Sequence, residues 1–283
     1  MTVCKTIQEC REARESLGKI AFVPTMGALH AGHVSLMQVA RQRAPRVAVS
    51  IFVNPTQFGP GEDLTRYPRP VEQDLATCRD AGVDLVFSPD PAEMYPLGSP
   101  EIAIDLPQFT TVLEGRHRPG HFKGVCQIVA KLFNIVQPQV ACFGQKDYQQ
   151  LAIIQAMVKA LDFPITIIPS PTIREPDGLA MSSRNRFLAP DERKRALSIS
   201  RALFLARDEV AKGIRQTNRL IALMQQRILA PGQLGHIPVY IDYVAAVDPA
   251  TFKPKEHVDG PILLAIATRV GNTRLIDNVV VEP

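Results

Sequence analysis

Two features that the sequence lacks argue against a membrane or secreted protein. No stretch of its 283 residues approaches the ~20 consecutive apolar residues that a helix needs to span a bilayer. Residues 1–19 mix charges of both signs and contain no apolar core of a signal peptide. We therefore expect a cytoplasmic protein that has no membrane partner.

Cysteine is scarce, and its spacing follows no known framework. The count of five is odd, and no pair has C-x-x-C spacing, which argues against a disulfide scaffold. A free cysteine usually behaves as a small apolar residue inside the protein. We expect this role for Cys4, Cys10, Cys78, Cys126 and Cys142.

The net charge is also small, which limits the partners that charge alone can predict. At +4 the chain is mildly basic and favours small anionic ligands. We interpret the basic runs at 184–186 and 193–195 as solvated surface, and so we expect no nucleic-acid partner. An RNA-binding module stays open as an alternative, and steeply salt-dependent RNA binding would identify it.

The first 170 residues alternate strand-like and helical patterns. Strand-like runs rich in β-branched and aromatic residues lie at 20–23, 47–53, 84–87, 140–143 and 165–168. Helical periods lie between them, with apolar residues at 125, 128, 129, 132, 133 and 136, and again at 151, 154, 158 and 161. This alternation predicts an α/β fold with a doubly wound parallel sheet.

The pattern changes after Pro171. A polar segment at 173–185 is followed by a helix that starts near Pro190 and by a second helix at about 217–229. Strands are then predicted at 239–247, 262–267 and 275–281, with Gly271-Asn272 as a turn signal. We therefore expect a larger domain at 1–172 and a smaller α+β domain at 173–283.

The chemistry concentrates first in residues 24–33, after the earliest strand-like run. Glycines there allow the backbone to approach a ligand closely. A helix predicted from about Gly32 to Arg43 would turn its free N–H groups toward an anion. His30 and His33 lie three apart, on one helix face, and both can donate hydrogen bonds to phosphate. A metal site and plain capping or surface histidines remain the alternatives.

Three further segments contain suitable polar groups. Residues 54–59 follow the second strand-like run and include Gln57, although Asn-Pro is also an ordinary turn. Lys146 stands after another strand, and Gln150 lies one helical turn beyond it, while Asp147 also suits an N-cap. Two serines and an arginine at 182–184 suit phosphate on a segment that closes over a nucleotide. Together these segments predict one site that binds the phosphates of a nucleotide.

Six strings, taken in order, resemble one family. They are PTMG at 24–27, SIFVNP at 50–55, RPGHF at 118–122, KDYQQL at 146–151, DGLAMSSRN at 177–185 and RLIDN at 274–278. They are similar to the pantoate–β-alanine ligases (pantothenate synthetases), within the HIGH-type nucleotidylyl transferase superfamily, and they span almost the whole chain. The resemblance implies a Rossmann-like fold, a homodimer, and ATP as a substrate used with Mg²⁺.

The resemblance also implies roles for individual residues. His33, the proposed proton donor of the family, would be catalytic, together with His30 and Lys146. Gln57 and Gln150 would bind pantoate, and Gln57 would also lie near β-alanine. Apart from the resemblance, we expect Asp74, which follows the Tyr67-Pro68-Arg69 loop, to be an outer ligand of the metal. The residues implied to bind ATP are Met26, Gly27, Ala28, Leu29, His30, Ala31, Gly32, His33, Gly144, Gln145, Lys146, Asp147, Ile173, Met181, Ser182, Ser183 and Arg184.

The chain departs from the family pattern at three positions. Gln145 replaces the usual Glu, which removes a negative charge beside Lys146 and matters only if that side chain contacts ATP or Mg²⁺. Thr56 replaces a common Met, and Ala31 replaces an acidic residue, but neither is expected to take part in chemistry. A nucleotidylyl transferase that stops after moving a nucleotide is the nearest alternative activity, and it would need a basic acceptor pocket.

Overall fold

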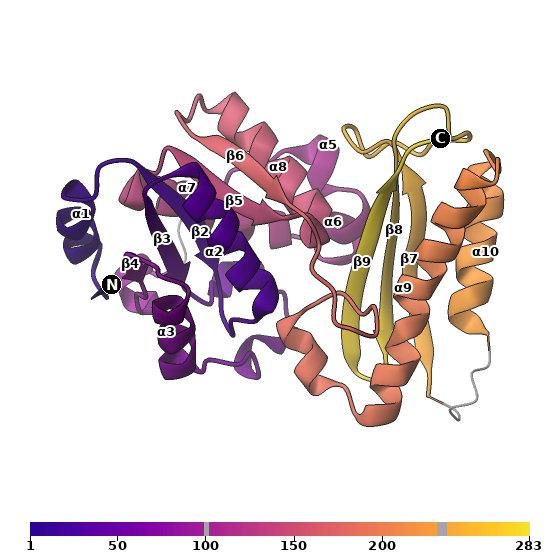
Figure 1. The fold of residues 1–283 in the computed structure, drawn as a ribbon, viewed down its shortest axis with the longest axis horizontal. Helices are drawn as coiled ribbons and strands as arrows, with labels where there is room; N and C mark the ends of the chain where they lie inside the picture. The colour runs from indigo at the N-terminus through magenta and orange to yellow at the C-terminus, as the bar shows by residue number, and fades with distance from the viewer. Residues whose placement is uncertain (99–101, 231–236) are drawn as a thin grey trace. The chain divides into compact units, whose positions relative to one another are not determined.

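The computed structural model describes residues 1–98, 102–230 and 237–283, which form two compact units (Figure 1). The first unit comprises Met1–Thr110, Arg118–Gln145 and Gln149–Thr172. The second comprises Thr111–His117, Lys146–Tyr148 and Ile173–Pro283. Two short segments from the earlier part of the chain are thus clustered with the C-terminal residues.

The first unit contains a six-stranded sheet in the order β1-β4-β3-β2-β5-β6 in which every neighbouring pair is parallel. Its strands are β1 (Thr2–Cys4), β2 (Ile20–Thr25), β3 (Arg46–Ile51), β4 (Leu85–Phe87), β5 (Val140–Gly144) and β6 (Thr166–Ser170). The sheet confirms the predicted doubly wound architecture. One detail differs: the short strand β1 precedes the run at 20–25, so the histidine segment follows the second strand. The order reverses between β2 and β5, where such sheets bind ligands at their carboxyl ends.

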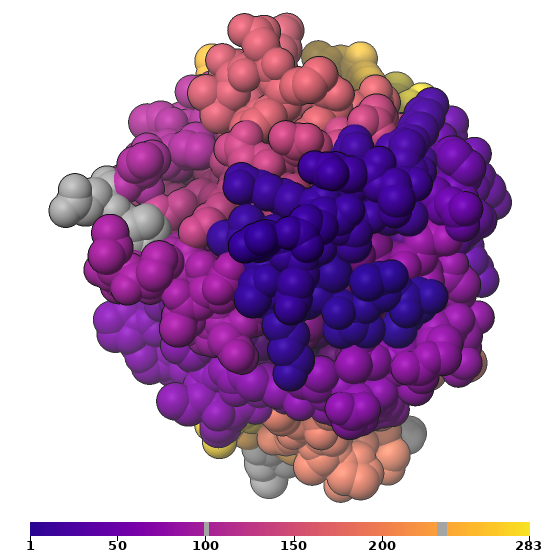
Figure 2. Space-filling view, turned by 90° about the vertical axis from the view of Figure 1, so that its left-hand side faces the viewer, coloured from indigo at the N-terminus to yellow at the C-terminus, as the bar shows by residue number. Residues whose placement is uncertain are grey.

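Helices cover both faces of this sheet, because alternate residues of each strand point to opposite sides. Helices α1 (Ile7–Glu15), α7 (His121–Val136) and α8 (Tyr148–Ala160) pack on the face that includes Phe22. Helices α2 (Ala31–Arg43) and α3 (Val71–Asp80) pack on the face that includes Val23. The N-terminal residues lie at the surface of this unit (Figure 2).

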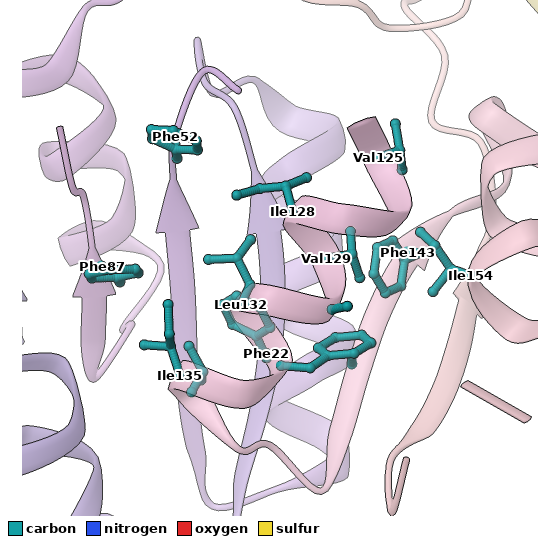
Figure 3. Packing of buried hydrophobic residues seen from close by; sticks show 14 of the residues in the cluster. Phe22, Phe52, Phe87, Val125, Ile128, Val129, Leu132, Ile135, Phe143 and Ile154 are labelled. Carbon is teal, nitrogen blue, oxygen red and sulfur yellow. The ribbon is translucent and has the colours of Figure 1, made fainter. Parts of the chain in front are cut away.

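Helix α7 confirms the clearest helical period in the sequence. Its residues Val125, Ile128, Val129 and Leu132 belong to the buried hydrophobic cluster drawn in Figure 3, and all four are at least 95% buried. The second stripe is only partly confirmed, since α8 ends at Ala160 and the Leu161 side chain beyond it is 50% exposed.

Several short helical elements were not predicted from the sequence. Each is too brief to show a repeating apolar pattern. They are η1 (Pro55–Gln57), η2 (Asp63–Thr65), α4 (Pro91–Met94), α5 (Pro107–Thr110), α6 (Leu113–His117), η3 (Gln145–Asp147) and η4 (Ser183–Phe187).

The second unit confirms the expected α+β pattern. Strands β7 (Val239–Val247), β8 (Ile262–Val270) and β9 (Thr273–Val281) form an antiparallel sheet in that order. Helices α9 (Pro190–Ala211) and α10 (Thr217–Leu229) pack against it through one continuous apolar core. The predicted Gly271 turn joins β8 to β9 with a left-handed φ of 55°, which glycine adopts without strain.

The cysteines match the expectation from the sequence. All five cysteines are free and buried. Burial raises the pKa of the Cys10, Cys78 and Cys126 thiols to about 12, so they are inert rather than nucleophilic. Among the residues that the structure describes, none of the helices is both long and apolar enough to cross a membrane.

Candidate active site

The two histidines shape the start of helix α2. His30 is the N-cap, and its Nδ1 accepts a hydrogen bond from Gly32 N at 3.1 Å, while His33 Nδ1 accepts from His30 N at 3.3 Å. The ring centroids are 4.1 Å apart. A neutral imidazole that accepts at Nδ1 holds its proton on Nε2. Capping therefore fixes a tautomer in which each Nε2 donates, so the capping interpretation and the phosphate-binding interpretation are compatible.

The loop before His30 is held by hydrogen bonds with Tyr67 and Asp74. Tyr67 Oη donates to Gly27 O at 2.8 Å, and Leu29 N donates to Asp74 Oδ1 at 2.7 Å. A Cβ on Gly27 would lie 2.4 Å from Asp74 Oδ2, so only glycine fits there. Asp74 is 1% exposed. Its expected role as an outer metal ligand remains a prediction, and one of its oxygens is already bonded to the loop.

Gln57 lies beside the histidine loop because buried hydrogen bonds orient its side chain. Asn54 Nδ2 donates to Gln57 Oε1 at 3.1 Å, and Gln57 Nε2 lies 3.1 Å from Met26 Sδ. Asn54 is 1% exposed and also accepts from Tyr95 Oη at 2.7 Å. The structure thus brings together the segments that follow β2 and β3, as the sequence predicted. Tyr95 was not foreseen, since it lies 41 residues from Asn54.

The backbone of Gln57 is held by the RPGHF string. His121 Nδ1 lies 2.8 Å from Gln57 O, an atom that only accepts, so Nδ1 carries the proton. Arg118 is fixed in turn by Glu62, with contacts of 2.6 and 2.8 Å. Burial opposes ionisation of Glu62, but the hydrogen bond and charge of Arg118 lower its pKa below the ordinary value of 4.5.

This ion pair predicts a pH-dependent contribution to stability. The folded state holds the Glu62 pKa below that of the unfolded chain, so the pair stabilises the fold above about pH 4.5 and the stabilisation is lost as pH falls below it. Glu62→Gln should flatten the stability profile in that acid range, as followed by urea unfolding at a series of pH values. An unchanged slope would contradict the assignment, and Glu72→Gln, an exposed position on α3, is the control.

Gly124 on α7 sets how closely this helix approaches the Gln57 turn. A Cβ at Gly124 would lie 2.5 Å from Thr56 O and 2.7 Å from Gln57 Cα, distances that backbone cannot tolerate. We expect Gly124→Ala to displace the Gln57 side chain and to lower the activity that depends on it by about 100-fold, the effect typical of a ~1 Å misplacement. Gly59→Ala is the control, since its Cβ meets only the Glu62 side chain at 3.9 Å. Equal kinetics in both variants would rule out this constraint on Gln57.

Residues 144–150 include the points at which the chain passes from one unit to the other. Gly144 ends β5, residues 145–147 form the turn η3, and Asp147 immediately precedes α8, as predicted. Lys146 and Asp147 cluster with the second unit, whereas Gln145 and Gln150 belong to the first. Lys146 Nζ lies 4.0 Å from Asp147 Oδ2, and Gln150 is half-buried in the first turn of α8.

The remaining predicted ATP residues lie together in the second unit. Met181 N donates to Ile173 O at 3.0 Å, beside a β-bridge between Arg174 and Ala180. Ser182 caps η4 by accepting from Arg184 N at 3.2 Å, and Ser183 is 8% exposed. The segment expected to be a polar loop is thus a small hydrogen-bonded hairpin followed by a helical turn.

Among the described residues, no three His, Cys, Asp or Glu side chains form a cluster that could hold a metal ion. Mg²⁺ commonly binds through substrate phosphates with only one or two protein carboxylates.

Comparison with known proteins gives a family for the whole chain. The family model described as pantoate-beta-alanine ligase matches residues 2–280. A pantothenate synthetase of Moorella thermoacetica is 51% identical over 286 residues, covering 100% of this chain and 99% of the relative. The crystal structure of the pantothenate synthetase from Thermus thermophilus matches with a TM-score of 0.93 and 43% identity, covering 100% of each chain.

A further crystal structure matches with a TM-score of 0.79 and 33% identity, covering 99% of this chain and 97% of its own. It is the pantoate-beta-alanine ligase from Francisella tularensis in complex with beta-gamma ATP and beta-alanine. These matches cover both units and every segment described above. The chain belongs to the pantoate-beta-alanine ligase family.

Proposed function

We propose that this ATP-dependent ligase joins pantoate to β-alanine through a pantoyl adenylate, with AMP and pyrophosphate as the other products. The observation that carries the proposal is the pair His30 and His33 at the start of α2, with Gln57 held beside the same loop through Met26. Phosphate donors and neutral amide groups then meet at the edge of the sheet where the acid has to be activated.

The ATP half of the proposal assigns phosphate donors within each unit separately, at the N-terminus of α2 in the first and among the cations and hydroxyls of the second. The helix dipole and the Nε2 donors of His30 and His33 favour the anion on the first unit. Lys146 and the 181–184 segment offer donors on the second. Mg²⁺ bound to the phosphates would neutralise charge on the leaving pyrophosphate. Other proposed ATP residues, Gly27 to Leu29 together with Gly144 and Gln145, would contribute mainly backbone.

The acid half assigns pantoate to Gln57 and Gln150, and β-alanine to the region of Gln57. Both side chains are neutral, so they can orient the hydroxyls and carboxylate of pantoate without neutralising the nucleophile. The buried Asn54 contact limits the rotation of the Gln57 amide. That rigidity favours a single orientation of the acid.

The reaction proceeds in two steps. A carboxylate oxygen of pantoate attacks the α-phosphorus of ATP, and the bond to the bridging oxygen breaks to release pyrophosphate. The β-alanine amine then attacks the acyl carbon, the bond between that carbon and the AMP oxygen breaks, and the amine loses a proton. His33, as proton donor, and Lys146 would stabilise the charge that builds on the phosphate oxygens.

An isotope experiment tests the order of bond changes. Pantoate labelled with ¹⁸O in its carboxylate should pass one label into AMP and none into pyrophosphate. Label in inorganic phosphate would indicate a γ-phosphoryl intermediate and refute the adenylate. Measuring AMP formation with each substrate withheld in turn would distinguish this ligase from a nucleotidylyl transferase. The ligase needs β-alanine to release AMP, whereas a nucleotidylyl transferase forms its product without β-alanine.

We also propose that the enzyme is a cytoplasmic homodimer with a domain division at residues 172/173. The family resemblance supports the dimer, and the change of sequence pattern after Pro171 supports the division. Sedimentation equilibrium of the full chain should give twice the mass of one chain, 31.2 kDa. A single 31.2 kDa species at micromolar concentration would contradict the dimer.

A further inference from the structure

Two adjacent residues of strand β9 anchor the two ATP-binding segments of the second unit. Successive side chains of a strand point to opposite faces of the sheet. Asp277 and Asn278 are 4% and 9% exposed, so neither is a surface residue. Each makes its main contact with a segment far away in sequence.

Asp277 holds the hairpin that leads to Ser182. It accepts two hydrogen bonds from the Arg174 guanidinium, at 2.6 and 2.9 Å, in a buried bidentate ion pair. The same guanidinium donates to Gly178 O at 3.2 Å and stacks 4.8 Å from the Phe204 ring of α9. Arg174 also forms the β-bridge at the base of the hairpin. The direction of the segment that carries Met181 and Ser182 therefore depends on the Arg174–Asp277 pair.

Asn278 holds the turn that carries Lys146. Its Nδ2 donates to Lys146 O at 2.7 Å, across 132 residues of sequence. The turn is braced nearby, where the Tyr148 ring lies 6.2 Å from Phe252. Because the contact is to the Lys146 carbonyl, it fixes the backbone from which the ammonium group extends and leaves the cation for the nucleotide.

Arg274, the first residue of the RLIDN string, extends the same arrangement. It lies on the face of β9 that Asn278 occupies, and it forms a buried pair with Glu114 at 2.7 Å. It also pairs with Asp242 at 2.6 Å. These contacts stiffen the sheet locally and are made to carboxylates outside the two ATP-binding segments. Substitutions that break these Arg274 contacts should therefore affect stability rather than the two ATP-binding segments.

We propose that Asp277 and Asn278 are positioning residues that set the spacing between Lys146 and the 181–184 segment, and so tune nucleotide binding without touching the nucleotide. The inference rests on the proposed ATP roles of Lys146 and residues 181–184. Because one dipeptide anchors one segment on each face of the strand, a shift of β9 moves both segments together.

The test uses the full-length enzyme and a non-hydrolysable ATP analogue. Asn278→Ala and Asp277→Asn should each weaken analogue binding and raise the KM for ATP by about tenfold, the effect of leaving a buried group unsatisfied. The KM for pantoate should change less than twofold. Asn272→Ala, in the exposed turn of the same hairpin, is the matched control and should behave as the wild type. If Asn278→Ala does not fold, the isosteric Asn278→Asp removes the same donor.

A double-mutant cycle separates this inference from the proposed function. Lys146→Ala keeps the carbonyl that Asn278 binds and removes only the cation. In that background Asn278→Ala should weaken analogue binding by less than twofold more. If the two substitutions weaken analogue binding independently, so that their effects multiply, the positioning role is wrong. It is also wrong if the affinities for ATP and for pantoate fall in parallel. If Lys146→Ala alone leaves analogue binding unchanged, the ATP role of Lys146 fails, and with it the part of the inference that concerns Asn278.

Discussion

Replacing His33 with alanine is expected to lower kcat at least ~100-fold and to leave the protein folded, since one donor to a developing oxyanion contributes about 10²–10³ in rate. Its Nδ1 is occupied as an acceptor for His30 N at 3.3 Å, so Nε2 is the nitrogen that would act on the substrate. Single-turnover formation of AMP and pyrophosphate measures the step directly. Product release then cannot mask the change.

Two further substitutions separate the structural and the chemical roles of His33. Asparagine places an oxygen near the position of Nδ1, so His33→Asn should retain the cap and lose the donor. Glutamine places an amide nitrogen near the position of Nε2, so His33→Gln should lose the cap and recover part of the rate. The alanine and glutamine variants should each be about 1 kcal/mol less stable, the usual value of one hydrogen bond. If the asparagine variant is fully active, His33 is only a capping residue.

The elements with long repeating patterns were predictable from sequence. The apolar period of α7 and the stripe of α9 repeat over several turns, and each buries one continuous face. Strand β1 has only three residues and could not show a period. Its place at the sheet edge comes from parallel pairing with β4, more than 80 residues away. Sequence periodicity carries no information about such pairing.

Candidate site residues could be selected from the sequence where polar residues directly follow strands, but the contacts that hold those residues in place could not be predicted. His30, Gln57 and Lys146 were identified because the carboxyl ends of parallel strands meet at one edge. Their supports are Asp74, Tyr95 and Asn278, which contact them or their loops across 41 to 132 residues. A single sequence contains the polarity of these residues but not their partners, since those contacts exist only after the sheet has formed.

The start of helix α2 differs slightly between the prediction and the structure. The sequence predicted a helix from about Gly32 to Arg43. The structure begins the helix one residue earlier because His30 acts as its N-cap. Histidine is not among the preferred N-cap residues. Helix stability alone therefore does not account for the two histidines at this position.

Replacing Lys146 with methionine is expected to lower kcat/KM for ATP by at least ~100-fold, because it removes a positive charge proposed to face the phosphates while keeping the length of the side chain. The Lys146 side chain is 19% exposed, and its Nζ lies 4.0 Å from the Asp147 carboxylate. That distance makes a weak pair, so little Coulomb energy is lost within the protein itself. The loss should therefore fall on ATP and leave the unfolding midpoint nearly unchanged.

Two further variants test whether the positive charge at position 146 is sufficient or whether the shape of the lysine side chain is also required. Lys146→Arg keeps the charge but replaces a compact, mobile cation with a planar fork, and it should recover only part of the activity. Lys159→Met removes an exposed lysine from the far end of α8 and should match the wild type. Because Asn278 holds the carbonyl and not the ammonium group, all three proteins should fold alike. Wild-type kinetics in Lys146→Met would exclude this cation from the reaction and leave phosphate recognition to the histidines and the 181–184 segment.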